Sequence, residues 1–181
     1  MGRIIGEQAR PGDIYLLTGP LGAGKTCLTQ GIAWGLGVTE PARSPTFVLM
    51  TRYRKRLTLH HLDLYRIGGP LEAWDLGVEE QLSGDGVCVV EWAERAEDIF
   101  PEDALWIALD YAILPQYRPQ YRDEGEKSPQ PPFTKGGIPG EPVGPRYGEG
   151  ARTITIGRHY SRYDALLEKL VSALPAVEVC A

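Results

Sequence analysis

Asparagine is absent from this chain, and cysteine occurs only three times in its 181 residues. Without asparagine the chain cannot contain N-K-x-D, the motif with which guanine-specific nucleotide-binding proteins usually read their base. The cysteines, Cys27, Cys88 and Cys180, are odd in number and show no paired spacing. They therefore favour reduced, buried thiols over a disulfide framework or a zinc site.

Long hydrophobic runs are also missing. None approaches the length that crosses a bilayer, and Met1–Gly6 contains no signal-peptide core. Both absences predict a cytoplasmic protein without a membrane partner. The net charge of −5 leaves no excess of basic residues for a broad nucleic-acid surface. We expect no binding to DNA, and we expect any contact with RNA to be local or to depend on a partner protein.

What the chain does contain is a phosphate-binding pattern. Gly19–Thr26 reads G-P-L-G-A-G-K-T and matches G-x-x-x-x-G-K-[ST]. In such a loop, glycines let the backbone N–H groups turn toward a phosphate, the lysine reaches the β- and γ-phosphates, and the threonine hydroxyl binds Mg²⁺. The predicted nucleotide contacts of this segment are Gly19, Leu21, Gly22, Ala23, Gly24, Lys25, Thr26 and Cys27.

The context of the loop supports this interpretation. The apolar run Ile14–Leu17 precedes it, and Lys25–Leu36 follows with apolar residues at the spacing of one helix face. Strand, loop and helix in this order place a phosphate at the helix N-terminus, where the helix dipole favours an anion. A glycine-rich turn that binds nothing fits this context less well. Because N-K-x-D is absent, ATP is favoured over GTP.

Two acidic residues are candidates for the carboxylate that holds Mg²⁺ in such proteins, directly or through water. Glu91 follows the apolar run Val87–Val90, and Asp63 ends the strand-like run Leu57–Leu62. Strand alternation places Asp63 on the same face as His61, which is more typical of a hydrogen-bonded strand histidine than of a metal ligand. The competing interpretations are a solvent-facing strand end for Glu91 and a turn or cap residue for Asp63.

Ser44-Pro45-Thr46 is the third candidate feature. It joins the predicted helix after the phosphate loop to the next strand, where switch segments sense a γ-phosphate. A plain turn is the alternative.

The remaining elements follow from periodicity and turn residues. The chain is expected to begin with the end of a helix over 1–10. The predicted strands cover 13–18, 47–53, 57–64, 87–90, 104–111 and 152–156, with a hairpin at the basic residues 54–56. The predicted helices cover 25–36, 70–81 and 158–174. In helix 70–81, apolar contacts are expected from Leu71, Trp74, Leu76 and Val78.

Residues 113–150 have a different composition. They hold eight of the fifteen prolines and seven of the 22 glycines. Such a segment cannot bury enough apolar surface to offset its ordering entropy, so we predict a disordered insertion. A proline-rich ligand for a partner protein is the alternative. The predicted domain then consists of 1–112 and 151–174, followed by a tail over 175–181.

Four motifs occur together in a fixed order. They are G-P-L-G-A-G-K-T at 19–26, S-P-T-F at 44–47, H-L-D-L-Y-R at 61–66 and V-E-W at 90–92. The set resembles the TsaE family, also called YjeE, bacterial ATPases needed to make threonylcarbamoyladenosine in tRNA. The resemblance covers about residues 1–111 and 152–174. It implies an α/β fold, a single P-loop NTPase-like domain with a mixed, mostly parallel central sheet flanked by helices.

The resemblance also implies an activity and partners. Binding and hydrolysis of ATP with Mg²⁺ would act on a complex of TsaB and TsaD, and tRNA would be contacted only through that complex. TsaD transfers the threonylcarbamoyl group to the adenosine beside the anticodon, and hydrolysis by TsaE resets the complex.

Carried over to this chain, the resemblance assigns a role to each motif residue. Lys25 would hold the phosphates, and Thr26 and Glu91 would serve Mg²⁺. Asp63 would orient the attacking water or complete the metal shell.

Three further residues are assigned in the same way. Thr46 would belong to the loop that senses the γ-phosphate, and Trp92 would stack near the nucleotide. Arg152 is similar to a late arginine of the family that approaches the nucleotide.

The chain departs from the family pattern in two places. Family members usually begin with a strand and most of a helix before the segment that starts here at Met1, so we expect an edge strand to be missing or to lie upstream. The stretch Lys127–Gly137 is foreign to the family.

Two other functions remain open on the sequence. A small-metabolite kinase would supply arginines in a lid over the phosphates, and the only candidates are Arg43 and the short run Arg52–Arg56. A nucleotide-dependent interaction switch would bind ATP without hydrolysing it.

Overall fold

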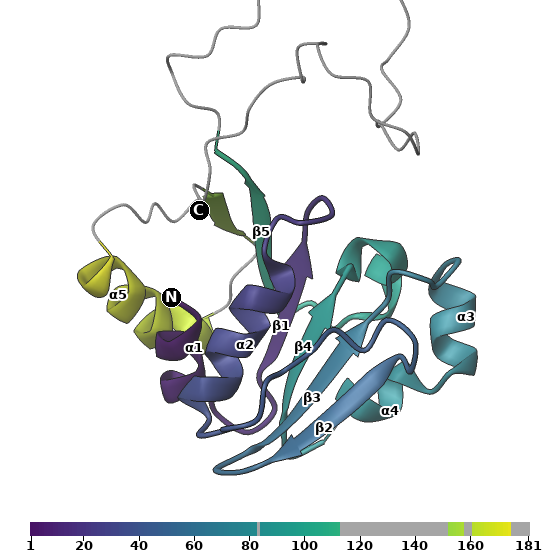
Figure 1. Cartoon of the computed structure of the whole chain (residues 1–181), viewed down its shortest axis with the longest axis horizontal. Coiled ribbons are helices and arrows are strands. Elements are labelled where there is room, and N and C mark those ends of the chain that lie inside the picture. Colours follow the sequence, from purple (N-terminus) through teal and green to yellow (C-terminus); the bar gives the residue numbers. More distant parts are fainter. Residues whose placement is uncertain (83, 113–151, 158–160, 175–181) are drawn as a thin grey trace, which may run out of the picture. The chain divides into compact units, whose positions relative to one another are not determined.

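The structure is a computed structural model that describes residues 1–82, 84–112, 152–157 and 161–174 (Figure 1). Residues 1–110 and those from 152 onward form one compact unit. Residues 111–151 form a second, of which only Tyr111 and Ala112 are described. The predicted insertion over 113–150 and the tail over 175–181 therefore lie outside the described residues. None of the described helices is long and apolar enough to cross a membrane.

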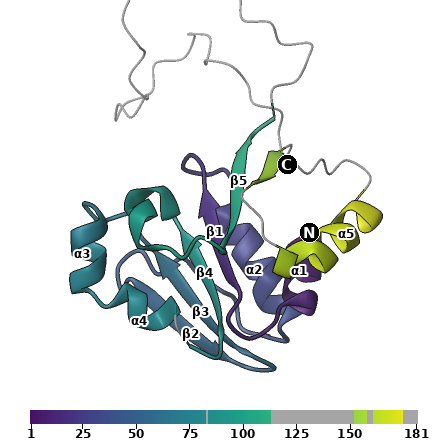
Figure 2. The ribbon, with the colours of Figure 1, turned by 180° about the vertical axis from the view of Figure 1, so that it is seen from behind.

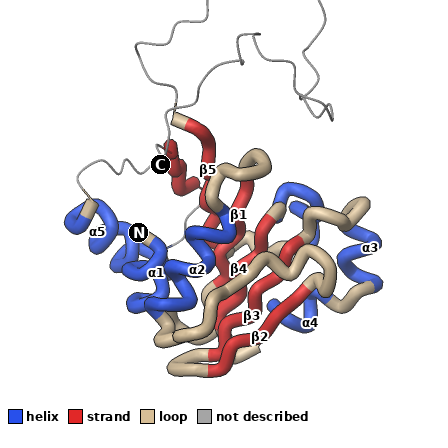
Figure 3. Tube along the Cα trace, viewed as in Figure 1, coloured by secondary structure: helices blue, strands red, loops and turns tan. Residues whose placement is uncertain are grey.

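A six-stranded sheet forms the centre of the first unit (Figure 3). Its strands, in spatial order, are β2 (Met50–Arg54), β3 (Thr58–Asp63), β4 (Val87–Glu91), β1 (Ile14–Thr18), β5 (Leu105–Tyr111) and β6 (Arg152–Gly157). β1 runs parallel to β4 and β5, and β3 runs parallel to β4. β2 is antiparallel to β3, as the predicted hairpin requires. The mixed, mostly parallel sheet is confirmed.

Helices cover both faces of this sheet (Figures 1 and 2). One face carries α1 (Gly2–Gln8), α2 (Lys25–Gly35) and α5 (Asp164–Ala173), and the other carries α3 (Pro70–Asp75), α4 (Val78–Leu82) and the 3₁₀ segment Ala93–Ile99. The central strand serves both layers because its side chains alternate. Tyr15 and Leu17 of β1 pack under α2, whereas Ile14 and Leu16 pack under α4. Strands buried on both faces explain the unbroken apolar runs in the sequence.

Two element predictions are wrong in detail. The first strand of the hairpin begins at Met50, because Leu49 has a φ of 65° and the chain turns there. Phe47 consequently lies outside the sheet, with its side chain 88% exposed. The predicted helix 70–81 is split into α3 and α4 by Gly77, whose φ of 67° is incompatible with a continuous helix.

That break also changes which side chains are buried. Leu71, Trp74 and Leu76 were expected to supply apolar contacts but are exposed, whereas Val78 is buried as expected.

Other predictions need a smaller correction. The last helix is described from Asp164, after a 3₁₀ turn over Ser161–Tyr163, and residues 158–160 are outside the described part. Of the two described cysteines, Cys88 is buried, and burial raises its thiol pKa to about 12. Cys27 is exposed, contrary to expectation, because it lies at the open side of the first turn of α2.

Candidate functional site

The polar residues singled out in the sequence meet at one edge of the sheet. Because β1, β3 and β4 are parallel, their carboxyl ends lie together, which is where ligands bind in folds of this type. Glu91 is in register with Leu17 on one side and with Asp63 on the other. The phosphate loop leaves β1 at the same edge and leads directly into α2.

The loop backbone needs glycine at specific points. Gly19 has a φ of 125°, and a Cβ there would overlap the carbonyl oxygen of Leu109 on β5. Gly24 caps the N-terminus of α2 with a φ of 107°. L-residues with a side chain rarely adopt either conformation, so these glycines fix the path by which the loop enters the helix.

Lys25 lies inside the loop, and its side chain is only 5% exposed. Its Nζ donates hydrogen bonds to the carbonyl oxygens of Gly19 at 2.5 Å and Pro20 at 3.0 Å. The ammonium also lies 3.6 Å from the centroid of the Trp92 ring, a cation–π arrangement. Burial lowers the pKa of Lys25, and three nearby carboxylates act in the opposite direction.

Trp92 forms an aromatic wall of the site with Tyr65. Their ring centroids are 4.9 Å apart. Trp92 has a φ of 61°, a conformation that is sparsely populated for residues other than glycine, asparagine and aspartate. Strained backbone of this kind persists where the surroundings hold it, often at functional sites.

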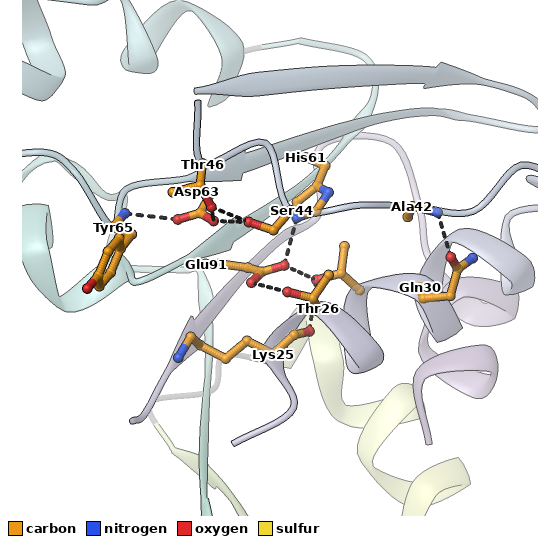
Figure 4. A network of polar contacts seen from close by, with 11 residues as sticks. Lys25, Thr26, Gln30, Ala42, Ser44, Thr46, His61, Asp63, Tyr65 and Glu91 are labelled. Atoms are coloured by element: carbon orange, nitrogen blue, oxygen red, sulfur yellow. Dashed lines mark hydrogen bonds and ion pairs between the residues drawn. The ribbon is translucent and has the colours of Figure 1, made fainter. Parts of the chain in front are cut away.

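Glu91 is buried, with 1% of its side chain exposed, so it is not a solvent-facing strand end. Its Oε2 accepts a hydrogen bond of 2.8 Å from the Thr26 hydroxyl (Figure 4). Its Oε1 lies 2.7 Å from Nε2 of His61 and 3.1 Å from the hydroxyl of Thr29. The carboxylate therefore connects β4 with the first turns of α2 and with β3.

Asp63, 3% exposed, holds the Ser44–Thr46 segment (Figure 4). Its Oδ2 accepts hydrogen bonds from the hydroxyls of Ser44 and, at 2.7 Å, of Thr46. Its Oδ1 accepts a hydrogen bond of 2.9 Å from the backbone N–H of Tyr65. Upstream, the N–H of Ala42 donates to the side chain of Gln30 on α2, which ties the same segment to the helix.

A cavity of about 370 Å³ opens between these elements, large enough for a small ligand. Its described lining consists of Leu21, Gly22, Gly24, Lys25, Thr26, Cys27, Ser44, Thr46, Asp63, Tyr65, Glu91 and Trp92. Ten of the thirteen predicted site residues are in this set. Motifs that are distant in the sequence therefore line one cavity.

The other three predicted residues do not line this cavity. Ala23 is buried, and Gly19 packs on β5. Arg152 donates from its Nε to the carbonyl oxygen of Ala23 at 3.1 Å and from a terminal nitrogen to that of Gly22 at 3.3 Å. In this structure Arg152 supports the backbone of the loop.

Sequence reasoning missed three of the groups that hold the carboxylates. It placed His61 on the same face as Asp63 but did not connect its imidazole with Glu91. Thr29 gave a weak signal, since it lies three residues after Thr26 and thus on the same helix face. No sequence signal indicated the hydrogen bond from the backbone N–H of Tyr65 to Asp63.

The donor set fits a hard divalent cation. Carboxylate and hydroxyl oxygens are the ligands that Mg²⁺ takes, and few protein ligands suffice because the ion keeps waters and phosphate oxygens. Thr26 and Glu91 supply such oxygens in direct contact with each other. The N-terminus of α2, with Lys25 beside it, is suited to an anion.

Comparison with known proteins gives consistent results. Residues 1–116 match the family model described as "Threonylcarbamoyl adenosine biosynthesis protein TsaE". The chain is 44% identical over 108 residues to the "tRNA threonylcarbamoyladenosine biosynthesis protein TsaE" of Treponema pallidum, covering 60% of this chain and 80% of that protein. It is 46% identical over 111 residues to the protein of the same name from Bacillus subtilis, covering 61% and 69%.

A solved structure is similar as well. The crystal structure of Bacillus subtilis YdiB superposes with a TM-score of 0.53 at 38% identity, covering 61% of this chain and 68% of that chain. The matched residues 1–116 include every described residue that lines the cavity.

Proposed function

The chain belongs to the TsaE family, and from that premise we propose that it binds and hydrolyses ATP with Mg²⁺. The family's role is the biosynthesis of threonylcarbamoyladenosine in tRNA. The single observation that carries the proposal is the convergence of Lys25, Thr26, Asp63 and Glu91 on one cavity that the phosphate loop also lines.

The phosphates are bound by the loop and by the start of α2. The backbone N–H groups there have no intrahelical acceptors and carry the positive end of the helix dipole. Lys25 neutralises phosphate charge by exchanging its loop carbonyl partners for phosphate oxygens. ATP is the preferred nucleotide because the chain has no N-K-x-D to read guanine.

Thr26 and Glu91 are the residues that would hold Mg²⁺. The ion, when bound, offsets the charge that develops on the phosphate oxygens during transfer. Glu91 is held from three sides, so the carboxylate keeps its orientation in the site.

Asp63 orients the attacking water. Its register opposite Glu91 places the two carboxylates side by side on neighbouring strands. Its Oδ2 also accepts hydrogen bonds from the hydroxyls of Ser44 and Thr46. A water or phosphate that competes for Asp63 therefore weakens the hydrogen bonds that fix the Ser44–Thr46 segment. The segment thereby reports on the γ-phosphate.

The partners that fit the family role are TsaB and TsaD. Hydrolysis would reset their complex between rounds of modification, and tRNA would be contacted through that complex. The activity would take place in the cytoplasm, where tRNA is modified.

One residue of the candidate lid for the kinase alternative, Arg56, is engaged elsewhere. The guanidinium of Arg56 donates hydrogen bonds to the carbonyl oxygens of Gly6, at 2.7 Å, and of Ala9 at the C-terminal end of α1. It thereby serves as a cap for that helix.

Phosphate release from Mg-ATP, measured with and without TsaB and TsaD, tests the proposal. Release that the two partners accelerate supports it. Release that needs a small metabolite as acceptor identifies a kinase, and binding without release identifies a switch.

A further inference from the structure

Glu91 is a buried carboxylate whose two oxygens have different partners. Oε2 faces the hydroxyl of Thr26, the residue that would share the metal ion. Oε1 faces His61 of β3 and Thr29 of α2. A buried carboxylate needs hydrogen-bond donors, and the donors determine which oxygen remains available to a ligand.

Of His61 and Thr29, only His61 has no other acceptor in the described part of the chain within reach of the nitrogen that faces Glu91. The hydroxyl of Thr29 has one proton and two acceptors within reach, Glu91 Oε1 at 3.1 Å and the carbonyl oxygen of Lys25 at 3.0 Å. Nε2 of His61 lies 2.7 Å from Oε1, and a carboxylate can only accept, so the imidazole carries a proton on Nε2. Nδ1 of His61 is buried and has no hydrogen-bond partner among the described residues.

The position of His61 is fixed by the sheet. It lies on β3 opposite Val89 of β4, and two residues further on Asp63 lies opposite Glu91. Its side chain is fully buried (0% exposed), so the ring cannot turn away without repacking the core.

We propose that His61 is a positioning residue that occupies Oε1 of Glu91 and thereby presents Oε2, together with the Thr26 hydroxyl, to the divalent ion of the bound nucleotide. This inference rests on the proposed Mg-ATP function. His61 is not among the described residues that line the cavity, so it acts only through Glu91.

Substitutions at His61 separate this role from a packing role. His61→Gln places an amide donor at the reach of Nε2, whereas His61→Asn places it at the reach of Nδ1, where it cannot meet Oε1. His61→Leu removes the donor altogether. His60→Leu is the matched control, because strand alternation directs His60 to the other face of the sheet.

The readout is the affinity for ADP, measured by calorimetry in EDTA and over a series of Mg²⁺ concentrations. We expect all variants to match the parent within about twofold in EDTA, since the loop and Lys25 are untouched. The Mg²⁺ concentration needed to tighten binding is expected to rise about 10- to 100-fold in the Leu and Asn variants. His61→Gln and His60→Leu are expected to stay near the parent.

Any other result overturns either the role of His61 or the proposed Mg-ATP function. Equal Mg²⁺ dependence in the Asn and Gln variants would show that the donor at Nε2 is irrelevant. If the Leu variant fails to fold, the Asn and Gln pair still decides. A parent chain that binds no ADP would contradict the proposed function itself, whereas a parent that binds ADP with Mg²⁺ and variants that do the same would contradict only the role of His61.

Discussion

Three charged side chains, Lys25, Asp63 and Glu91, are almost fully buried at one edge of the sheet. Burial of a charge is unfavourable unless hydrogen bonds and opposite charges compensate it. Here each charge has its own set of partners, two carbonyl oxygens for the lysine and three groups within hydrogen-bond distance for each carboxylate. Such an arrangement contributes little to stability on balance, so its presence favours a functional explanation.

Glu91→Gln tests this explanation at the scale of one residue. The amide keeps the size of the side chain but removes the charge that would serve the metal. We expect the rate of Mg-ATP hydrolysis to fall by about 100-fold or more, because the lost charge acts chiefly on the transition state. The affinity for ATP should change much less.

The matched control is Glu102→Gln, an exposed acidic residue that does not line the cavity. Phosphate release should be near the parent rate in the control. A Glu91→Gln variant that hydrolyses ATP as fast as the control would refute the role of Glu91.

At the same scale, the sequence predicted which charged residues line the cavity but not the groups that hold them. Lys25, Thr26 and Glu91 could be found because each lies in a short continuous motif: the phosphate loop for the first two, and the end of an apolar strand for Glu91. The contact between His61 and Glu91 joins residues 30 positions apart. No local pattern encodes it, since it depends on which strands are neighbours in the sheet.

Among the helices, α1 and α2 approach each other unusually closely. Gly2 and Gly6 of α1 face Gly31 and Gly35 of α2, and a Cβ on Gly6 would overlap the carbonyl oxygen of Ile32. Small residues on both helices thus let two backbones touch. This crossing anchors α2, whose first turn carries Lys25 and Thr26.

Gly6→Ala should therefore destabilise the protein although alanine favours a helix. The added methyl group meets backbone, which cannot rotate away, so we expect a loss of roughly 1–3 kcal/mol or more in the free energy of unfolding. Urea denaturation monitored by circular dichroism measures it. Gly157→Ala is the control, because a Cβ there meets none of the described residues within 4 Å; equal stabilities of the two variants would contradict the crossing.

The last described segment is joined to the core by Tyr163. Its hydroxyl accepts a hydrogen bond from the N–H of Ile14 and donates one to the carbonyl oxygen of the same residue, both at 3.1 Å. We expect Tyr163→Phe to lower the free energy of unfolding by about 1–3 kcal/mol, because both buried backbone groups of Ile14 lose this partner.

The same denaturation experiment measures this loss. Tyr53→Phe on β2 is the comparison, with an expected change within about 0.5 kcal/mol. If the two variants lose the same stability, the Tyr163 hydroxyl does not hold the segment to β1.

At the scale of elements, the sequence predicted the type of the described strands and α-helices but not the 3₁₀ segment Ala93–Ile99, and the predicted boundaries were less accurate. Apolar runs such as Val87–Val90 predicted buried strands because both faces of the sheet are covered. Phe47 was assigned to a strand on hydrophobicity alone, yet the turn at Leu49 excludes it. The prediction of one helix over 70–81 was wrong because Gly77, with a positive φ, interrupts the helix despite the apolar pattern on both sides of it.

At the scale of the whole molecule, the central sheet combines five strands from residues 14–111 with one strand from residues 152–157. β6 follows residues 113–151 in sequence and is the hydrogen-bonded neighbour of β5. The class of the fold was predictable from the motif set, whereas the strand order was not, because pairing depends on contacts across the whole chain. The cavity is lined, among the described residues, only by positions 21–92.

Deletion of residues 118–148 should consequently leave the affinity for ATP within about twofold of the parent. Residues 113–117 and 149–151 remain to connect β5 with β6, and eight extended residues span about 26 Å, longer than either strand. Calorimetric titration of the shortened chain measures the effect. A large loss of affinity in a variant that still folds would show that the insertion takes part in binding.

The proposed function requires that Mg-ATP occupy the cavity lined by the phosphate loop. Calorimetric titration of the purified full chain with a non-hydrolysable ATP analogue and Mg²⁺, beside the Lys25→Ala variant, tests it most directly. We predict binding at one site in the parent and an affinity lowered by roughly 100-fold in the variant, which loses a charge-assisted contact. Absence of binding to the parent, or equal binding to both proteins, would contradict it.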